Sequence, residues 1–172
     1  MFKPNLEFRE KLLDFSLKDK IKYCYQCNRC SEVCPVAAVA PGRYEPRQLI
    51  MASMLGLPQM AMEAPDNFMI WGCQVCDTCD EICPNNIELT EIFCLLKNLS
   101  TQAGKAPEYY TAQAKTILEN GKAIPLMGAI ERRRGKYGLP EAPQPDVNEV
   151  QTILKETSLD KKIGYEWEEG GN

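Results

Sequence analysis

The chain has 172 residues, of which 44% are hydrophobic, and its formal net charge is −4. This apolar content is enough for a packed core, and the acidic balance disfavours a nucleic-acid partner. Histidine is absent, which excludes Rieske centres, histidine-ligated haem and histidine-containing zinc or copper sites.

The first half of the chain has apolar residues at helical spacing and almost none of the alternation that strands require, so we predict an all-α fold. A charged, amphipathic N-terminal helix leads into a first cysteine run at residues 24–35. The N-terminal segment has no signal-peptide pattern, so we expect a cytoplasmic protein. Pro46 opens a helix that ends near Gly56. The apolar stretch 49–57 is about half of the roughly 20 residues that a membrane span needs, so no membrane anchor is expected.

A second cysteine run occupies residues 73–84, and more helical pattern follows it. After residue 135 the composition changes, with three prolines between residues 140 and 145, which favours an extended segment. The predicted helices of this second half cover residues 89–103, 107–120, 124–134 and 147–156.

The two cysteine runs are copies of one pattern, CxxCxxCxxxCP, shifted by 49 residues. This spacing is the ligand pattern of a pair of [4Fe-4S] clusters. Three cysteines of a run can wrap one cluster, and the fourth, held before proline, is directed to the other cluster. We therefore predict one cluster on Cys24, Cys27, Cys30 and Cys83, and a second on Cys73, Cys76, Cys79 and Cys34.

Two other uses of these cysteines are disfavoured. Structural zinc sites pair two CxxC knuckles, and a third cysteine with a CP ending in each run would be superfluous there. A disulfide scaffold does not suit the odd total of nine cysteines. Cys94 fits neither run, and it is either an inert buried residue or a group that faces a cluster, another packed surface or a partner protein.

Basic residues gather at two places in this acidic chain. Those that flank the first cysteine run would raise the potential of its cluster. A denser patch lies near residue 134, where it is either a solvated helix end or a dock for an acidic redox partner. The first group is Lys18, Lys20, Lys22 and Arg29, and the second is Arg132, Arg133, Arg134 and Lys136.

The segments PRQLIMASMLGL, WGCQVCDTCDEICP and ERRRGKYGLPEAP accompany this pattern. With them, the chain resembles the iron-sulfur C subunit of heterodisulfide reductase over residues 5–145. The resemblance implies the α-helical ferredoxin fold with two [4Fe-4S] clusters. We expect a dicluster domain at residues 1–134, and at 135–172 an extended Pro-rich partner-docking segment that includes a short helix.

The resemblance also implies a function. Such a protein relays single electrons from a flavin-containing subunit to a catalytic subunit with CCG domains, which reduces the mixed disulfide of coenzymes M and B in methanogenesis. A hydrogenase or formate dehydrogenase supplies the electrons. The chain would then be the relay subunit of an oxidoreductase and carry no substrate active site of its own. The alternatives are an equivalent relay in another anaerobic complex and a free-standing dicluster ferredoxin.

Overall fold

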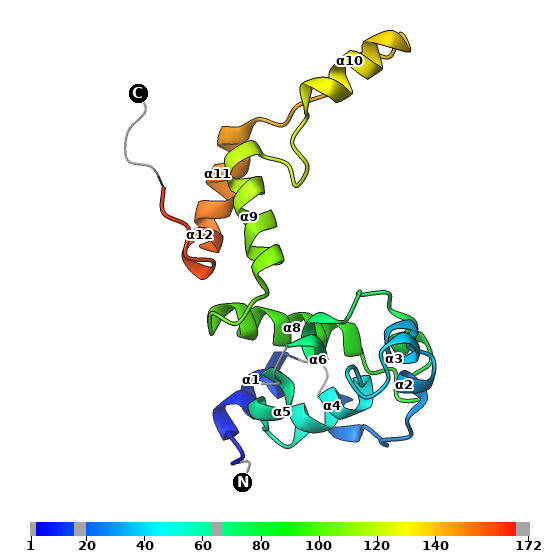
Figure 1. Cartoon of the computed structure of the whole chain (residues 1–172). Helices are drawn as coiled ribbons and strands as arrows, with labels where there is room; N and C mark the ends of the chain where they lie inside the picture. The colour runs from blue at the N-terminus through cyan, green and yellow to red at the C-terminus, as the bar shows by residue number, and fades with distance from the viewer. Residues whose placement is uncertain (1–2, 16–19, 63–66, 168–172) are drawn as a thin grey trace. The chain divides into compact units, whose positions relative to one another are not determined.

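The computed structural model describes residues 3–15, 20–62 and 67–167. These residues form helices joined by turns and loops, and none of them is in a strand (Figure 1). The predicted all-α class is therefore confirmed. None of the helices in these ranges is long and apolar enough to cross a membrane. The chain divides into two compact units, residues 1–106 (unit 1) and 107–172 (unit 2).

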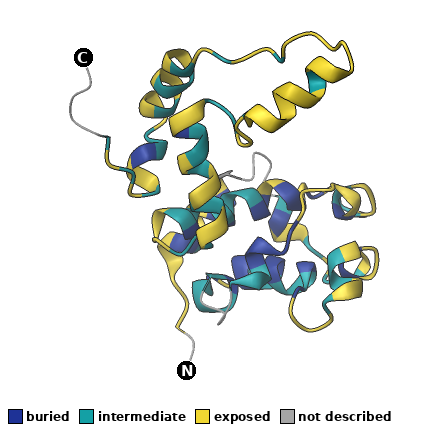
Figure 2. Cartoon of the chain, turned by 45° about the horizontal axis from the view of Figure 1, so that its top comes forward, coloured by how far each residue is buried: buried dark blue, intermediate teal, exposed yellow. Residues whose placement is uncertain are grey.

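Unit 1 has its core where three helices meet, namely α1 (Leu6–Phe15), α4 (Pro46–Met54) and α8 (Leu89–Gln102). Leu12, Ile50 and Leu96, one from each helix, are completely buried. Figure 2 shows buried residues gathered on these elements. Burial of this apolar surface is the main force that holds the three helices together. The shorter helices of unit 1 are η1 (Lys20–Tyr23), α2 (Arg29–Glu32), α3 (Pro35–Val39), α5 (Pro58–Met62), α6 (Phe68–Trp71) and α7 (Thr78–Glu81).

The two cysteine runs continue differently after their prolines. Pro35 occupies the first turn of α3, directly after Cys34, as the pattern predicts. A proline directly after the last cysteine of a run can begin a helix, and the sequence predicts the same for Pro84. This prediction is wrong, because Pro84 lies in a turn in which Asn86 N–H donates to the Cys83 carbonyl at 3.0 Å. Helix α8 therefore begins five residues later, at Leu89.

Unit 2 is built on α9 (Glu108–Asn120), which packs against α11 (Val147–Glu156). Leu118 of α9 is completely buried, and its carbonyl accepts a hydrogen bond from the Gln151 side chain at 2.9 Å. Helix α12 (Leu159–Lys162) follows α11 closely. Because α9 packs on α11, the division falls after Ala106, whereas the sequence suggested a boundary after residue 134. The domain boundary after residue 134 stays a prediction from the sequence.

The segment that precedes α11 makes its hydrogen bonds through two basic side chains. Arg134, on the exposed helix α10 (Gly128–Lys136), donates to the Pro140 carbonyl from Nη2 at 2.8 Å. Lys122 Nζ donates to the Pro143 carbonyl at 2.7 Å. The backbone of a proline can accept a hydrogen bond through its carbonyl but has no N–H to donate. Pro140 and Pro143 are therefore held in place through their carbonyl groups.

Candidate metal centres

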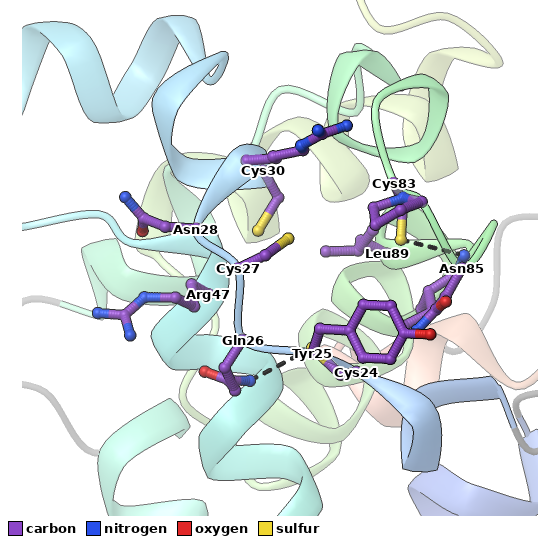
Figure 3. Close-up of a pocket in the computed structure, with 13 residues that line it drawn as sticks. Cys24, Tyr25, Gln26, Cys27, Asn28, Cys30, Arg47, Cys83, Asn85 and Leu89 are labelled. Carbon is purple, nitrogen blue, oxygen red and sulfur yellow. Dashed lines mark hydrogen bonds between the residues drawn. The ribbon is translucent and has the colours of Figure 1, made fainter.

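Cysteines from both runs line one pocket, which we call site 1. The pocket has about 380 Å³ of space not filled by protein atoms. In Figure 3, Cys27, Cys30 and Cys83 direct their sulfur atoms toward one space. Three members come from the loop of the first run and one from the end of the second. The four cysteines of site 1 are Cys24, Cys27, Cys30 and Cys83.

A second pocket, site 2, mirrors this composition. It has about 300 Å³ of empty space and is lined by three cysteines of the second run together with one from the first. No three Cys, Asp or Glu side chains in the described ranges converge tightly enough to hold a single metal ion. Each set of four surrounds a pocket instead. The four cysteines of site 2 are Cys34, Cys73, Cys76 and Cys79.

Helices α4 and α8 begin at the two sites. Arg47 and Leu89, in their first turns, line site 1. Pro46 and Thr90, each beside one of those residues, line site 2. The same helix ends therefore position both pockets, and the core of unit 1 supports them.

Each cysteine loop turns through two residues with left-handed backbone. These residues flank the second cysteine of the run, with φ of 55° and 71° at Gln26 and Asn28, and 52° and 58° at Val75 and Asp77. The two pairs are related by the same 49-residue shift as the cysteines. A β-branched residue such as Val75 rarely adopts this conformation, because its Cβ crowds the backbone. Left-handed residues in such loops can turn backbone N–H groups toward an anionic group.

Several donors are aimed at the sulfur atoms. Val75 N–H donates to Cys73 Sγ at 3.4 Å, and Ile87 N–H donates to Cys83 Sγ at the same distance. The Gln26 side-chain amide donates to Cys24 Sγ at 3.3 Å. Such donors stabilise negative charge on sulfur, which is the form that binds iron.

Tyr44 is the largest fully buried side chain at either site, with 1% of its surface exposed. It lines site 2 beside Cys73. Burial raises the pKa of Tyr44 far above its ordinary value, and the neighbouring thiol Cys73 adds to this effect. The hydroxyl therefore stays protonated, so beside Cys73 it can act as a donor but not as an acceptor of negative charge.

The cysteines themselves differ in proton affinity. Burial raises the pKa of Cys30 to about 11, with a smaller contribution from neighbouring Cys24. Burial also raises the pKa of Cys79, helped by Asp80. The exposed Cys76 has a lowered pKa because its thiolate accepts from the Thr78 hydroxyl and backbone. Thiols with a raised pKa, such as Cys30 and Cys79, hold their protons until a metal displaces them.

The donor set fits a cubane cluster at each site. A cubane needs one thiolate at each of four corners, together with amide donors that offset its negative charge. Each pocket has four cysteine sulfurs and N–H groups directed at them. When bound, such clusters supply one-electron transfer.

Sequence reasoning missed three of the residues that shape these sites. Tyr44 lies outside the cysteine runs and Val75 occupies a variable position of the second run, so their roles depend on tertiary contacts and backbone conformation. Asp80 stands within the second run, where its charge beside Cys79 was a signal that could have been used.

Cys94 is half-buried and lines neither site. In the basic patch of Arg132, Arg133, Arg134 and Lys136, the Arg134 side chain donates a hydrogen bond to the Pro140 carbonyl.

Together these features define a helical iron-sulfur protein of the dicluster class, and comparison with known proteins agrees. The 4Fe-4S dicluster domain family matches residues 19–87. The chain is 33% identical to the C 2 iron-sulfur subunit of the CoB-CoM heterodisulfide reductase of Methanocaldococcus jannaschii, over 95% of this chain and 88% of that protein.

Two further relatives have similar names. The chain is 32% identical to the C subunit of the H2:CoB-CoM heterodisulfide, ferredoxin reductase of Methanothermobacter thermautotrophicus, covering 95% and 89% of the two chains. It is 32% identical to the C2 subunit of the H2/formate:CoB-CoM heterodisulfide, ferredoxin reductase of Methanococcus maripaludis, covering 88% and 82%. The chain belongs to the family of heterodisulfide reductase C subunits.

Proposed function

We propose that the chain holds two [4Fe-4S] clusters, one at site 1 and one at site 2, and relays single electrons within a heterodisulfide reductase. The observation that carries the proposal is the composition of the two pockets, each with three cysteines of one run and the fourth of the other. Crossed ligation of this kind is the pattern of two-cluster ferredoxins. It also ties the two runs together and keeps the clusters near each other.

The chain's own residues have defined parts in this function. The cysteine thiolates hold iron, and the N–H groups of Val75 and Ile87 stabilise their charge. Tyr44 and the helix starts of α4 and α8 shield site 2 from water. No proton-transfer group is required, because the transferred species is an electron.

The names of the relatives refer to the CoB-CoM heterodisulfide, to ferredoxin, and to hydrogen or formate, which supports partners of the heterodisulfide reductase kind. We propose that a flavin-containing subunit delivers electrons and that a catalytic subunit with CCG domains receives them, in the cytoplasm. A hydrogenase or formate dehydrogenase stands upstream. The substrate disulfide is reduced on the partner, and this chain provides no active site for it.

Paired serine substitutions test the ligand assignment. The double variant Cys34→Ser/Cys73→Ser removes two ligands from site 2 only, so about four of about eight iron atoms per chain are expected to remain. If the runs were not crossed, the same variant would damage both clusters and lose most iron. Cys94→Ser is the matched control and keeps the full iron content.

The relay itself is tested by affinity purification of the full chain from its native host under anoxia. We expect copurification with a flavoprotein and a CCG-domain protein, and a complex that reduces the coenzyme M–coenzyme B disulfide. Recovery of the chain alone, still loaded with iron, would favour a free-standing ferredoxin. Copurification with a different terminal enzyme would favour an equivalent relay in another complex.

A further inference from the structure

The duplication allows each residue of site 1 to be compared with its equivalent at site 2. The residue that follows the third cysteine is Ser31 in the first run and Asp80 in the second, 49 positions apart. Asp80 Oδ1 lies 3.5 Å from the sulfur of Cys79. At the equivalent place site 1 has a neutral hydroxyl, so the two sites differ by a full charge beside one cysteine.

The Asp80 carboxylate is held firmly in this position. It accepts the N–H groups of Leu89 at 2.7 Å and Thr90 at 3.1 Å, and also the Thr90 hydroxyl. These donors belong to the first turn of α8, where a carboxylate is favoured. The charge cannot turn away from Cys79 without uncapping that helix.

Ser31 performs the same capping task at α4 without a charge. Its hydroxyl accepts the Arg47 N–H at 3.2 Å and donates to Glu45 Oε2 at 3.1 Å. The Glu45 carboxylate is thus bound to the Ser31 hydroxyl. Arg29 and Arg47 both line site 1, although Figure 3 shows the Arg47 guanidinium turned away from the pocket.

The other groups at site 2 are weaker or less direct. No charged residue lines this pocket. Lys97 Nζ donates to the backbone carbonyl of Cys73 at 2.7 Å, so this positive charge is directed at the backbone and not at a sulfur. The Tyr44 hydroxyl acts on Cys73 as a dipole and not as a full charge. The Asp80 carboxylate, 3.5 Å from the Cys79 sulfur, is a full charge in direct contact with a sulfur of site 2, and Coulomb energy is largest at such short distances.

Burial acts in the same direction as Asp80. At site 2 Cys34, Cys73 and Cys79 are buried, whereas no cysteine of site 1 is buried to that degree. Adding an electron adds negative charge to a cluster. A drier environment disfavours that charge, as does a neighbouring carboxylate.

We infer that Asp80 and the burial of site 2 make it the low-potential site, so that an electron shared between the two sites resides mainly at site 1. This inference rests on the proposed function, since it requires a cluster at each site. Ser31 and Asp80 are then the residues that set the direction of the relay. One electron is involved: the cluster at site 2 is oxidised, the cluster at site 1 is reduced, and no proton moves.

Two substitutions of opposite sign test this in the full, iron-loaded chain. Midpoint potentials are measured by EPR-monitored redox titration. Asp80→Asn keeps an oxygen that can accept from the α8 N–H groups and removes the negative charge, so the lower of the two midpoint potentials is expected to rise. The expected shift is about 59 mV, which for one electron is about a tenfold change in the reduction equilibrium. Ser31→Asp lowers the higher potential by a similar amount. Glu81→Gln, an exposed neighbour of Asp80, is the matched control and moves neither.

The outcomes separate cleanly. If Asp80→Asn raised the higher potential, the order of the sites would be reversed; if neither variant moved any potential, the role of these residues would be refuted. Should Asp80→Asn fail to bind iron, Ser31→Asp decides alone. A wild-type chain with neither iron nor an EPR signal would contradict the proposed function itself, before any potentials are compared.

Discussion

Tyr44 lies beside Cys73 at site 2, in a position that is almost completely shielded from solvent. Tyr44 stands just before α4 and Cys73 just after α6, so the contact forms only when unit 1 is folded. A hydrogen bond to a ligand sulfur stabilises the more negative, reduced form of a cluster.

Replacing Tyr44 with phenylalanine is expected to lower one midpoint potential. A neutral hydrogen bond contributes about 1 kcal/mol, so the reduction equilibrium of site 2 shifts by about fivefold. Redox titration of the loaded chain measures this, with Tyr23→Phe as a control because Tyr23 is 66% exposed. An unchanged pair of potentials would show that the hydroxyl does not act on the cluster.

Gly72→Ala is expected to destabilise unit 1 and reduce iron loading at site 2. A Cβ at Gly72 would lie 2.8 Å from the Phe68 carbonyl oxygen and 3.1 Å from the Tyr44 ring. Overpacking of this kind costs about 1–3 kcal/mol. Denaturant unfolding and iron analysis measure the effect. Gly135→Ala is the control, since its Cβ would meet no atom within 4 Å, and equal losses in both variants would argue against the clash.

Removal of iron is expected to unfold unit 1 selectively. The cysteine loops contain four non-glycine residues in left-handed conformation, which cost free energy unless clusters hold them. Unit 2 contains no cysteine and packs through α9 and α11. Hydrogen exchange after anaerobic chelation should therefore rise throughout residues 20–102 and change little in α9 and α11. Uniform protection in both units would contradict the dependence of unit 1 on metal.

Acid is expected to release the C-terminal contact of Asp160. Its carboxylate accepts from Trp167 Nε1 at 2.8 Å, and this bond, followed by the Lys161 N–H, lowers the pKa of Asp160. The folded pKa lies below the unfolded value of about 3.9, so the stabilisation is complete above that pH and is lost as the pH falls through the folded pKa.

Tryptophan fluorescence against pH measures this release, since Trp167 is one of only two tryptophans. Asp160→Asn keeps an acceptor oxygen but cannot titrate, so its Trp167 signal should be independent of pH in the acid range. The same transition in the Asp160→Asn variant would assign it to another group.

Local sequence pattern was sufficient to predict the features that depend on the spacing of neighbouring residues. The eight cysteines of the repeated runs, the all-α class and helix α11 at Val147–Glu156 follow from spacing alone. Pro84 shows the limit of such inference. Its sequence context matches that of Pro35, yet it lies in a turn, because the chain bends there to bring the Asp80 carboxylate onto the first turn of α8.

By itself, the sequence determined which side chains can bind metal and which segments are helical, because both depend on residues a few positions apart. The crossed grouping of the cysteines was also a prediction from the repeated pattern, whereas tertiary structure alone decided that Tyr44 lies beside Cys73 and where the Asp80 charge is held. These relations join residues distant in the chain, and they arise only when α1, α4 and α8 bury their apolar faces together.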